Sequence, residues 1–148
     1  MSADHNKATV RRFWECVWNE QKVSTIDEIV SPDFRSHGPG PLLLTRNQFR
    51  DALQLVHALQ EAKHTRVHHK VEMIIAEKST VAILLSVKND EQRKWARLLE
   101  DVSGDIDLPT AMFNAASPLY FAVFYRMEDG YIVEQWLPTD NAAPSLTP

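Results

Sequence analysis

His37 and Arg35 are the residues whose types and spacing first suggest chemistry. One residue separates them in a segment that reads as extended, so their side chains share a face if it is a strand. An imidazole titrates near neutral pH and can transfer protons, and a guanidinium can stabilise a developing oxyanion. We therefore expect His37 to transfer a proton and Arg35 to clamp an oxygen. The alternatives are a histidine that anchors a loop and a solvated arginine.

The last predicted strand carries further polar candidates. Glu134 lies among apolar residues, where a carboxyl group would have a raised pKa and could serve as acid or base. Gln135 lies on the opposite face and could orient a substrate by hydrogen bonding. Asp140 follows Pro138 and suits either catalysis or a turn.

Aromatic side chains are the expected walls of a binding site. Trp14, Trp18 and Phe121 offer flat apolar area, although core packing explains them almost as well. Tyr120 adds a hydroxyl group. These residues suit a flat, apolar ligand.

A histidine cluster raises the question of a metal site. His68 and His69 are adjacent on a predicted strand and face opposite sides, and no cysteine pair or carboxylate completes a familiar ligand set with His57 and His64. The chain also lacks a glycine-rich phosphate loop, and Cys16 reads as an inert residue beside an apolar stripe. We expect no metal and no cofactor.

Composition limits the class of protein. The 148 residues are 44% hydrophobic and 24% charged, with a net charge of −4 and a single cysteine. This predicts one globular domain, residues 1–148, with a loose C-terminal tail at 138–148. We expect a small-molecule partner and neither nucleic acid nor a membrane, because the chain has no basic face and no long apolar run. A polar opening segment and the lone cysteine predict a cytoplasmic protein.

Three helices are predicted first. Apolar residues at helical spacing predict a helix over residues 4–19. Thr25 and Glu28 predict a capping box for a short helix that Pro32 ends, before an extended segment over 33–37. Thr45 and Gln48 predict a second capping box and a third helix.

Strands follow. Alternation predicts a half-buried strand over 67–75, in which Met73 and Ile75 share the face of His69. An apolar run predicts a central strand over 81–87 that is covered on both faces, and residues 118–126 and 131–137 flank a hairpin turn at Asp129-Gly130. Residues 90–101 read as an inserted helix and 103–116 as a long connection. Helices followed by an antiparallel sheet predict an α+β fold, with a strongly bent sheet around an apolar pocket.

Two stretches carry a resemblance to a known family. Residues 6–19 (NKATVRRFWECVWN) with 31–37 (SPDFRSH) resemble the opening of SnoaL-like polyketide cyclases, of the nuclear-transport-factor-2-like superfamily. Residues 127–136 (MEDGYIVEQW) with Asp140 resemble their closing hairpin. The resemblance implies a cone-shaped α+β barrel, often dimeric, that works by acid–base chemistry in a hydrophobic cavity. A homodimer is therefore expected.

The resemblance also places residues. A histidine is common at the position of His37. Leu137, Gln135 and Val123 stand where such cyclases carry their catalytic Asp and His residues, so the resemblance implies that these three line the substrate site and that the chemistry differs. We expect a cofactor-independent cyclase or isomerase of an apolar polycyclic metabolite. The alternatives are a non-catalytic binding protein and a module that dimerises through its sheet.

Overall fold

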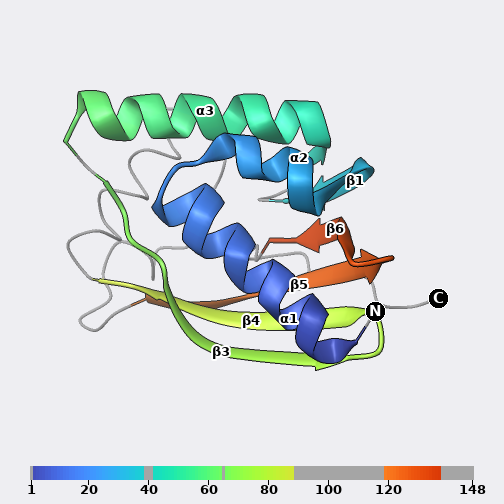
Figure 1. The fold of residues 1–148 in the computed structure, drawn as a ribbon. Coiled ribbons are helices and arrows are strands. Elements are labelled where there is room, and N and C mark those ends of the chain that lie inside the picture. The colour runs from blue at the N-terminus through green and yellow to red at the C-terminus, as the bar shows by residue number, and fades with distance from the viewer. Residues whose placement is uncertain (1, 39–41, 65, 89–118, 138–148) are drawn as a thin grey trace.

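The computed structural model describes residues 2–38, 42–64, 66–88 and 119–137. The predicted helix over 90–101, the connection over 103–116 and the C-terminal tail lie outside these ranges. The described elements are helices on one side and a six-stranded sheet on the other (Figure 1).

The first predicted helix divides into two kinds of helix. An α-helix, α1 (Ala3–Arg12), begins at Ser2, whose hydroxyl group accepts a hydrogen bond from the His5 amide. A π-helix, η1 (Phe13–Asn19), continues it, and the Glu20 amide closes it on the Glu15 carbonyl five residues back. A π-helix has more residues in each turn than an α-helix and is often found at functional sites. Apolar periodicity does not distinguish the two.

The second helix is shorter than predicted. A 3-10 turn, η2 (Val23–Thr25), leads into α2 (Ile26–Ile29), and the Thr25 side chain makes no capping hydrogen bond. The predicted capping box is therefore wrong here, because Thr25 is itself helical. The helix also ends before Pro32, which lies within strand β1 (Val30–His37). Strand β2 (Leu43–Thr45) pairs with the end of β1.

The third helix confirms its prediction. Helix α3 (Arg46–Ala62) begins with the full capping box, in which Thr45 and Gln48 each bond the other's main chain. Its buried stripe consists of Phe49, Leu53, Val56, His57 and Gln60.

A β-bulge changes the predicted faces of the next strand. Strand β3 (Lys70–Glu77) pairs with β4 (Thr80–Val87), and the register shifts between Val71 and Met73. A bulge reverses the alternation that follows it. Met73 and Ile75, predicted to share the buried face of His69, are therefore exposed.

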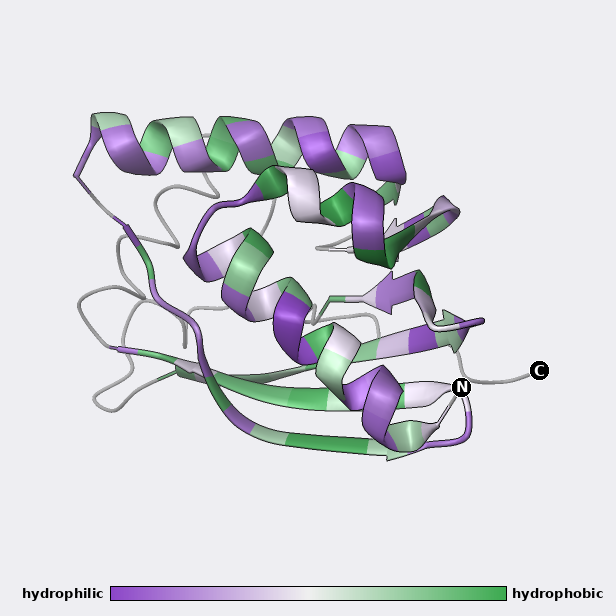
Figure 2. Cartoon of the chain, viewed as in Figure 1, coloured by the Kyte–Doolittle hydropathy of each residue, from purple (hydrophilic) through white to green (hydrophobic). Residues whose placement is uncertain are grey.

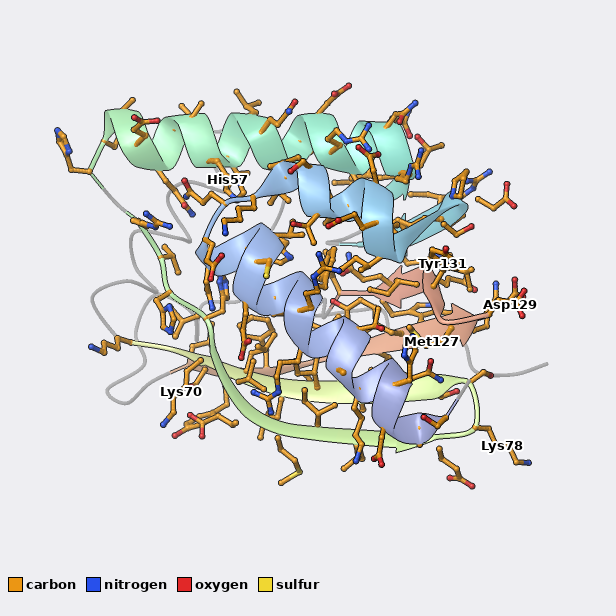
Figure 3. All side chains as sticks on the ribbon, in the orientation of Figure 1. His57, Lys70, Lys78, Met127, Asp129 and Tyr131 are labelled. Atoms are coloured by element: carbon orange, nitrogen blue, oxygen red, sulfur yellow. The ribbon has the colours of Figure 1, made fainter. Side chains whose placement is uncertain are left out.

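The closing hairpin is confirmed. Strand β5 (Leu119–Glu128) turns at Asp129 and Gly130 into β6 (Tyr131–Trp136). Both turn residues have positive φ, 51° and 83°, as the tightest hairpin turns require. Figure 3 shows Asp129 at the tip of this hairpin.

The sheet is mixed and open. The strand order is β2-β1-β6-β5-β4-β3, and the β1–β6 pair is parallel, whereas the other pairs are antiparallel. The prediction of an antiparallel sheet is corrected at this one pair, since β1 enters from α2 and not from a hairpin. The helices cover one face, with α1 against β3 and β4 and α3 against β1.

The core lies between the helices and this inner face. Its aromatic members include Phe13, Trp14, Phe34, Phe49 and Tyr125. Figure 2 shows hydrophobic colour along much of β3 and β4 and alternating hydrophilic and hydrophobic bands along α3. The outer face of the sheet also carries apolar side chains: Met73, Ile75, Tyr120 and Phe124 are exposed. Among the described elements, helix α1 packs against the inner face of the predicted central strand β4.

Candidate functional site in the aromatic interior

A chain of hydrogen bonds crosses the interior. Trp14 Nε1 donates to the Tyr125 hydroxyl oxygen at 2.8 Å, and the Tyr125 hydroxyl group donates to Gln135 Oε1 at 2.7 Å. Gln135 Nε2 then donates to Ser36 Oγ at 2.9 Å. All four side chains are buried. This series of hydrogen bonds joins η1 to strands β5, β6 and β1.

Trp14 fixes which atom donates and which accepts in each of these hydrogen bonds. An indole nitrogen can only donate, so the Tyr125 hydrogen must go to Gln135, which sets the orientation of the amide. Burial raises the pKa of Tyr125 well above its ordinary value, and the hydrogen bond with Trp14 offsets this only in part. Tyr125 therefore stays neutral, and its hydrogen is committed to Gln135.

His69 lies beside the same aromatic side chains. Its ring centroid is 5.1 Å from that of Trp14, 5.4 Å from Trp18 and 6.1 Å from Phe121. Trp14 and Trp18, four residues apart in η1, are stacked at 4.9 Å. The imidazole is thus enclosed by aromatic walls and is 2% exposed.

Asn19 fixes the main chain of His69. Its Nδ2 donates to the His69 carbonyl at 2.7 Å, and its Oδ1 accepts from the His69 amide at 2.8 Å. Two bonds from one rigid amide hold the residue in a single orientation. The last residue of η1 therefore positions His69, which lies just before β3.

The two buried histidines are both neutral at pH 7. Burial first, then the charges of His68 and His57, lower the pKa of His69 to about 3. Burial and the charge of Arg66 lower the pKa of His57, on α3, to about 4. A neutral imidazole carries one donor and one acceptor nitrogen, so it can give and take hydrogen bonds or protons.

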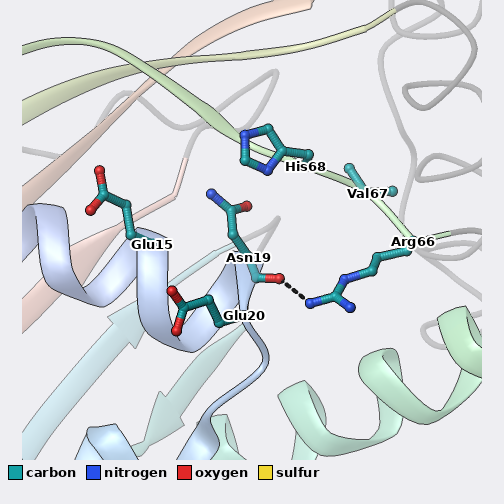
Figure 4. Close-up of a pocket in the computed structure, with 6 residues that line it drawn as sticks. All are labelled: Glu15, Asn19, Glu20, Arg66, Val67 and His68. Atoms are coloured by element: carbon teal, nitrogen blue, oxygen red, sulfur yellow. Dashed lines mark hydrogen bonds between the residues drawn. The ribbon is translucent and has the colours of Figure 1, made fainter.

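A surface hollow lies next to this interior (Figure 4). It has a volume of about 620 Å³ and is lined by Glu15, Asn19, Glu20, Arg66, Val67 and His68. Arg66 donates to the Asn19 carbonyl across it. Five of its six lining residues have polar or charged side chains. It shares Asn19 with the clamp on His69.

His37, Arg35 and Glu134 lie on the outer face of the sheet. They alternate with the buried Phe34, Ser36 and Gln135 along paired strands. His37 Nε2 lies 2.7 Å from Glu134 Oε2, and its ring stacks on Trp136 at 5.4 Å. Arg35 donates to the carbonyls of Asp33 and Phe34. The structure thus brings His37 and Glu134 together, away from the aromatic interior.

The pKa of Glu134 is lowered, whereas the sequence predicts a raised one. Burial would raise its pKa, but hydrogen bonds from Arg126 and His37 lower it overall. Arg126 Nε donates to Glu134 Oε1 at 2.9 Å. Glu134 is therefore an ionised carboxylate and not the raised-pKa acid that its apolar sequence neighbours suggest.

The predicted wall residues divide between the two faces. Trp14, Trp18, Phe121, Val123, Gln135 and Leu137 belong to the interior or pack against it. Tyr120 is exposed on the outer face, because it alternates with Phe121 along β5. Asp140 lies outside the described residues.

Sequence reasoning missed His69 and Tyr125 as members of one site. The alternation with Val67 and Val71 did indicate that His69 faces inward, but no local pattern pairs it with η1. In the described parts of the chain, no group of three His, Cys, Asp or Glu residues could hold a metal ion. Within the same ranges, no helix has the length and apolar character needed to cross a membrane.

Known proteins give the family context. A structure described as a candidate ketosteroid isomerase from Kribbella flavida matches with 13% identity and a TM-score of 0.60, over 96% of this chain and 84% of that one. IdmH, a candidate polyketide cyclase from Streptomyces antibioticus, matches with 19% identity and a TM-score of 0.60, over 92% of each chain. An LEH-like epoxide hydrolase of M. tuberculosis matches with 12% identity and a TM-score of 0.54, over 92% of this chain and 84% of that one.

These likenesses are at low identity and show the shared fold. No protein with a curated description matches the chain. The sequence profile of the SnoaL-like domain, however, matches residues 10–135, from the buried stripe of α1 to Gln135 on the last strand. The chain therefore belongs to the SnoaL-like family.

Proposed function

We propose that this protein is a cofactor-independent cyclase or isomerase that acts on an apolar, polycyclic secondary metabolite by acid–base catalysis. The observation that carries the proposal is His69, a neutral imidazole held by Asn19 among Trp14, Trp18 and Phe121. The proposal is also supported by the structural neighbours of the chain, which include a candidate ketosteroid isomerase and a candidate polyketide cyclase. The lone cysteine is consistent with a cytoplasmic location.

His69 supplies the proton transfer in this proposal. An isomerisation or cyclisation through an enol removes a proton at one atom and returns it at another, with no net change. A neutral imidazole can accept at one nitrogen and donate at the other. Because burial makes the imidazolium costly, transfers in which one proton leaves as another arrives are favoured. The low pKa makes His69 a weak base, so in this proposal its N–H group polarises the carbonyl oxygen while its other nitrogen accepts the proton.

The aromatic walls supply orientation. Trp14 and Trp18 are stacked beside the imidazole, and the partly buried Trp18 offers the flat apolar area. Holding a flexible polycyclic precursor in its reactive shape converts an improbable encounter into a local step, which can contribute several kcal/mol. The hydrogen-bonded chain from Trp14 to Ser36 keeps this wall rigid.

His37 and Arg35 take a different role in this account. They share the outer face of the sheet with Glu134 and with exposed apolar side chains. We propose that this face meets a second copy of the chain, so that a homodimer forms and His37 contributes to its interface.

A non-catalytic binding protein is the second candidate. Gln135, Val123 and Leu137 are the interior residues at the positions where the family resemblance implies catalytic groups, and none of the three can transfer a proton. Such a protein would hold the same ligand without changing it.

Metabolite profiling separates the two. The small-molecule extract of the source organism is incubated with wild-type protein, with His69→Gln and with no protein, and is analysed by chromatography and mass spectrometry. The proposal expects a compound that changes retention at unchanged mass, or with loss of one water, only with the wild type. A compound that co-purifies unchanged would identify a binder. Equal conversion by wild type and His69→Gln would refute the assignment of His69.

A further inference from the structure

Two buried polar atoms near His69 are without a hydrogen-bond partner among the described residues. They are Trp18 Nε1 on η1 and His57 Nε2 on α3. Neither atom takes part in the hydrogen-bonded chain or in the clamp on His69. Leaving a buried polar atom unpaired destabilises the folded protein, so each of the two calls for an explanation.

Both residues are neighbours of His69. The ring centroids of Trp18 and His69 are 5.4 Å apart, and His57, when protonated, is the smallest of the three causes that lower the pKa of His69. Gln21, just beyond η1, donates to Gln60, which lies three residues after His57 on α3. Figure 3 shows His57 on the side of α3 that faces η1.

The position of His57 is one where an apolar residue would carry no such cost. It continues the buried stripe of Phe49, Leu53 and Val56, and it is 8% exposed. A leucine there would complete an ordinary amphipathic helix. A histidine there is useful if its ring nitrogen finds a partner beyond the residues that the structure describes.

The chemistry of the two atoms selects the partner. An indole nitrogen only donates, so the partner must accept a hydrogen bond from Trp18. A hydroxyl oxygen can accept from Trp18 and donate its own hydrogen to a neutral His57 Nε2. The neighbouring rings of Trp18, Phe49 and His69 suit a flat ring as the carrier of that hydroxyl. Arg66 is the cation that acts on His57, and His69 is the other titratable group beside it.

We propose that Trp18 Nε1 and His57 Nε2 form a binding subsite for a ring hydroxyl group on a flat, apolar ligand. The inference rests on the proposed function in that the ligand would be the substrate. It narrows the substrate class to polycyclic compounds with a hydroxyl group, and it assigns recognition to α3 as well as to the sheet.

A pair of matched probes tests the subsite. β-Naphthol and β-methylnaphthalene have nearly the same shape, but only the first has a hydroxyl group. Binding to the wild type is measured by tryptophan fluorescence and calorimetry. We expect β-naphthol to bind about tenfold or more tightly than β-methylnaphthalene, the ratio that one well-made hydrogen bond supports. Equal affinities, or no binding of β-naphthol, would overturn the inference.

Variants assign the preference to the two atoms. Trp18→Phe keeps an aromatic ring and removes the N–H group, and His57→Leu removes the imidazole. Each is expected to bring the affinity ratio close to one while β-methylnaphthalene still binds, which shows that the site is folded. Trp136→Phe and His68→Gln are the matched controls and should leave the ratio unchanged. A ratio that survives in either Trp18→Phe or His57→Leu would contradict a shared subsite.

Nuclear magnetic resonance of the wild type covers the case in which a variant does not fold. β-Naphthol should shift the Trp18 Nε1–H and His57 Nε2 resonances, and β-methylnaphthalene should leave them in place. Unshifted resonances would overturn the inference. None of these readouts requires turnover, so a failure of the proposed catalytic function and a failure of this subsite are distinguishable.

Discussion

Acidification should destabilise the protein through its two buried histidines. Their pKa values are lowered from 6.5 to about 3 for His69 and about 4 for His57. Between the folded and unfolded pKa values, the two histidines are therefore protonated in the unfolded chain and neutral in the folded protein. The stability that these groups contribute is complete above pH 6.5 and is lost as the pH falls from there toward the folded pKa values.

The magnitude follows from the two shifts. At pH 5, about 1.5 units below the unfolded pKa, each histidine costs about 2 kcal/mol relative to pH 7.5, or about 4 kcal/mol together. That is a large share of the roughly 5–15 kcal/mol typical of a domain. Glu134 has a lowered pKa and loses its contribution at lower pH, as the pH falls through its folded pKa, so it does not obscure the window.

Urea unfolding at pH 7.5 and pH 5, followed by tryptophan fluorescence, measures this difference. His69→Gln and His57→Gln remain neutral in both states, so each should reduce the pH dependence by about 2 kcal/mol, whatever its effect on absolute stability. His68→Gln, at an exposed neighbour, is the matched control. Equal free energies of unfolding at the two pH values in the wild type would refute the reasoning.

Three further predictions concern stability and assembly. Tyr125→Phe removes the hydroxyl group between Trp14 and Gln135 and should lower the free energy of unfolding in urea by about 2–4 kcal/mol, because two buried groups lose a partner. The control Tyr120→Phe should be nearly neutral, and equal losses in the two variants would contradict the role of the buried hydrogen bonds. Thr45→Ala removes the helix cap of α3 and should cost about 1 kcal/mol in the same assay, and an unchanged midpoint would argue against the cap. If the outer face forms a homodimer, Ile75→Asp should convert the dimer to a monomer in light scattering, and an unchanged mass would place the interface elsewhere.

The sequence predicts those features that local chemistry determines. The capping box at Thr45 and the turn at Asp129-Gly130 are set by neighbouring residues, and both are present. The prediction of which β3 side chains face inward was wrong beyond Val71. The bulge there depends on pairing with β4 and leaves no local pattern in the sequence. The π-helical turns of η1 were not predicted either, because the apolar periodicity of the sequence does not distinguish a π-helix from an α-helix.

The site was harder to predict than the fold. The family resemblance implied an inward Gln135, and the structure places it there, bonded to Tyr125 and Ser36. The positions of His37 and His69 on opposite sides of the sheet depend on how distant strands pair. Asn19 and His69 are brought together across 50 residues of chain, which no spacing rule detects.

The central claim is that proton transfer takes place at His69 in the aromatic interior and not at His37 on the outer face. The most direct test compares the rate at which wild type, His69→Gln and His37→Gln convert the same metabolite, with folding confirmed by circular dichroism. We predict that His69→Gln loses about 100-fold or more in rate, as expected for a lost acid–base group, and that His37→Gln stays within a few-fold of wild type. Loss of conversion in His37→Gln with full activity in His69→Gln would contradict the account.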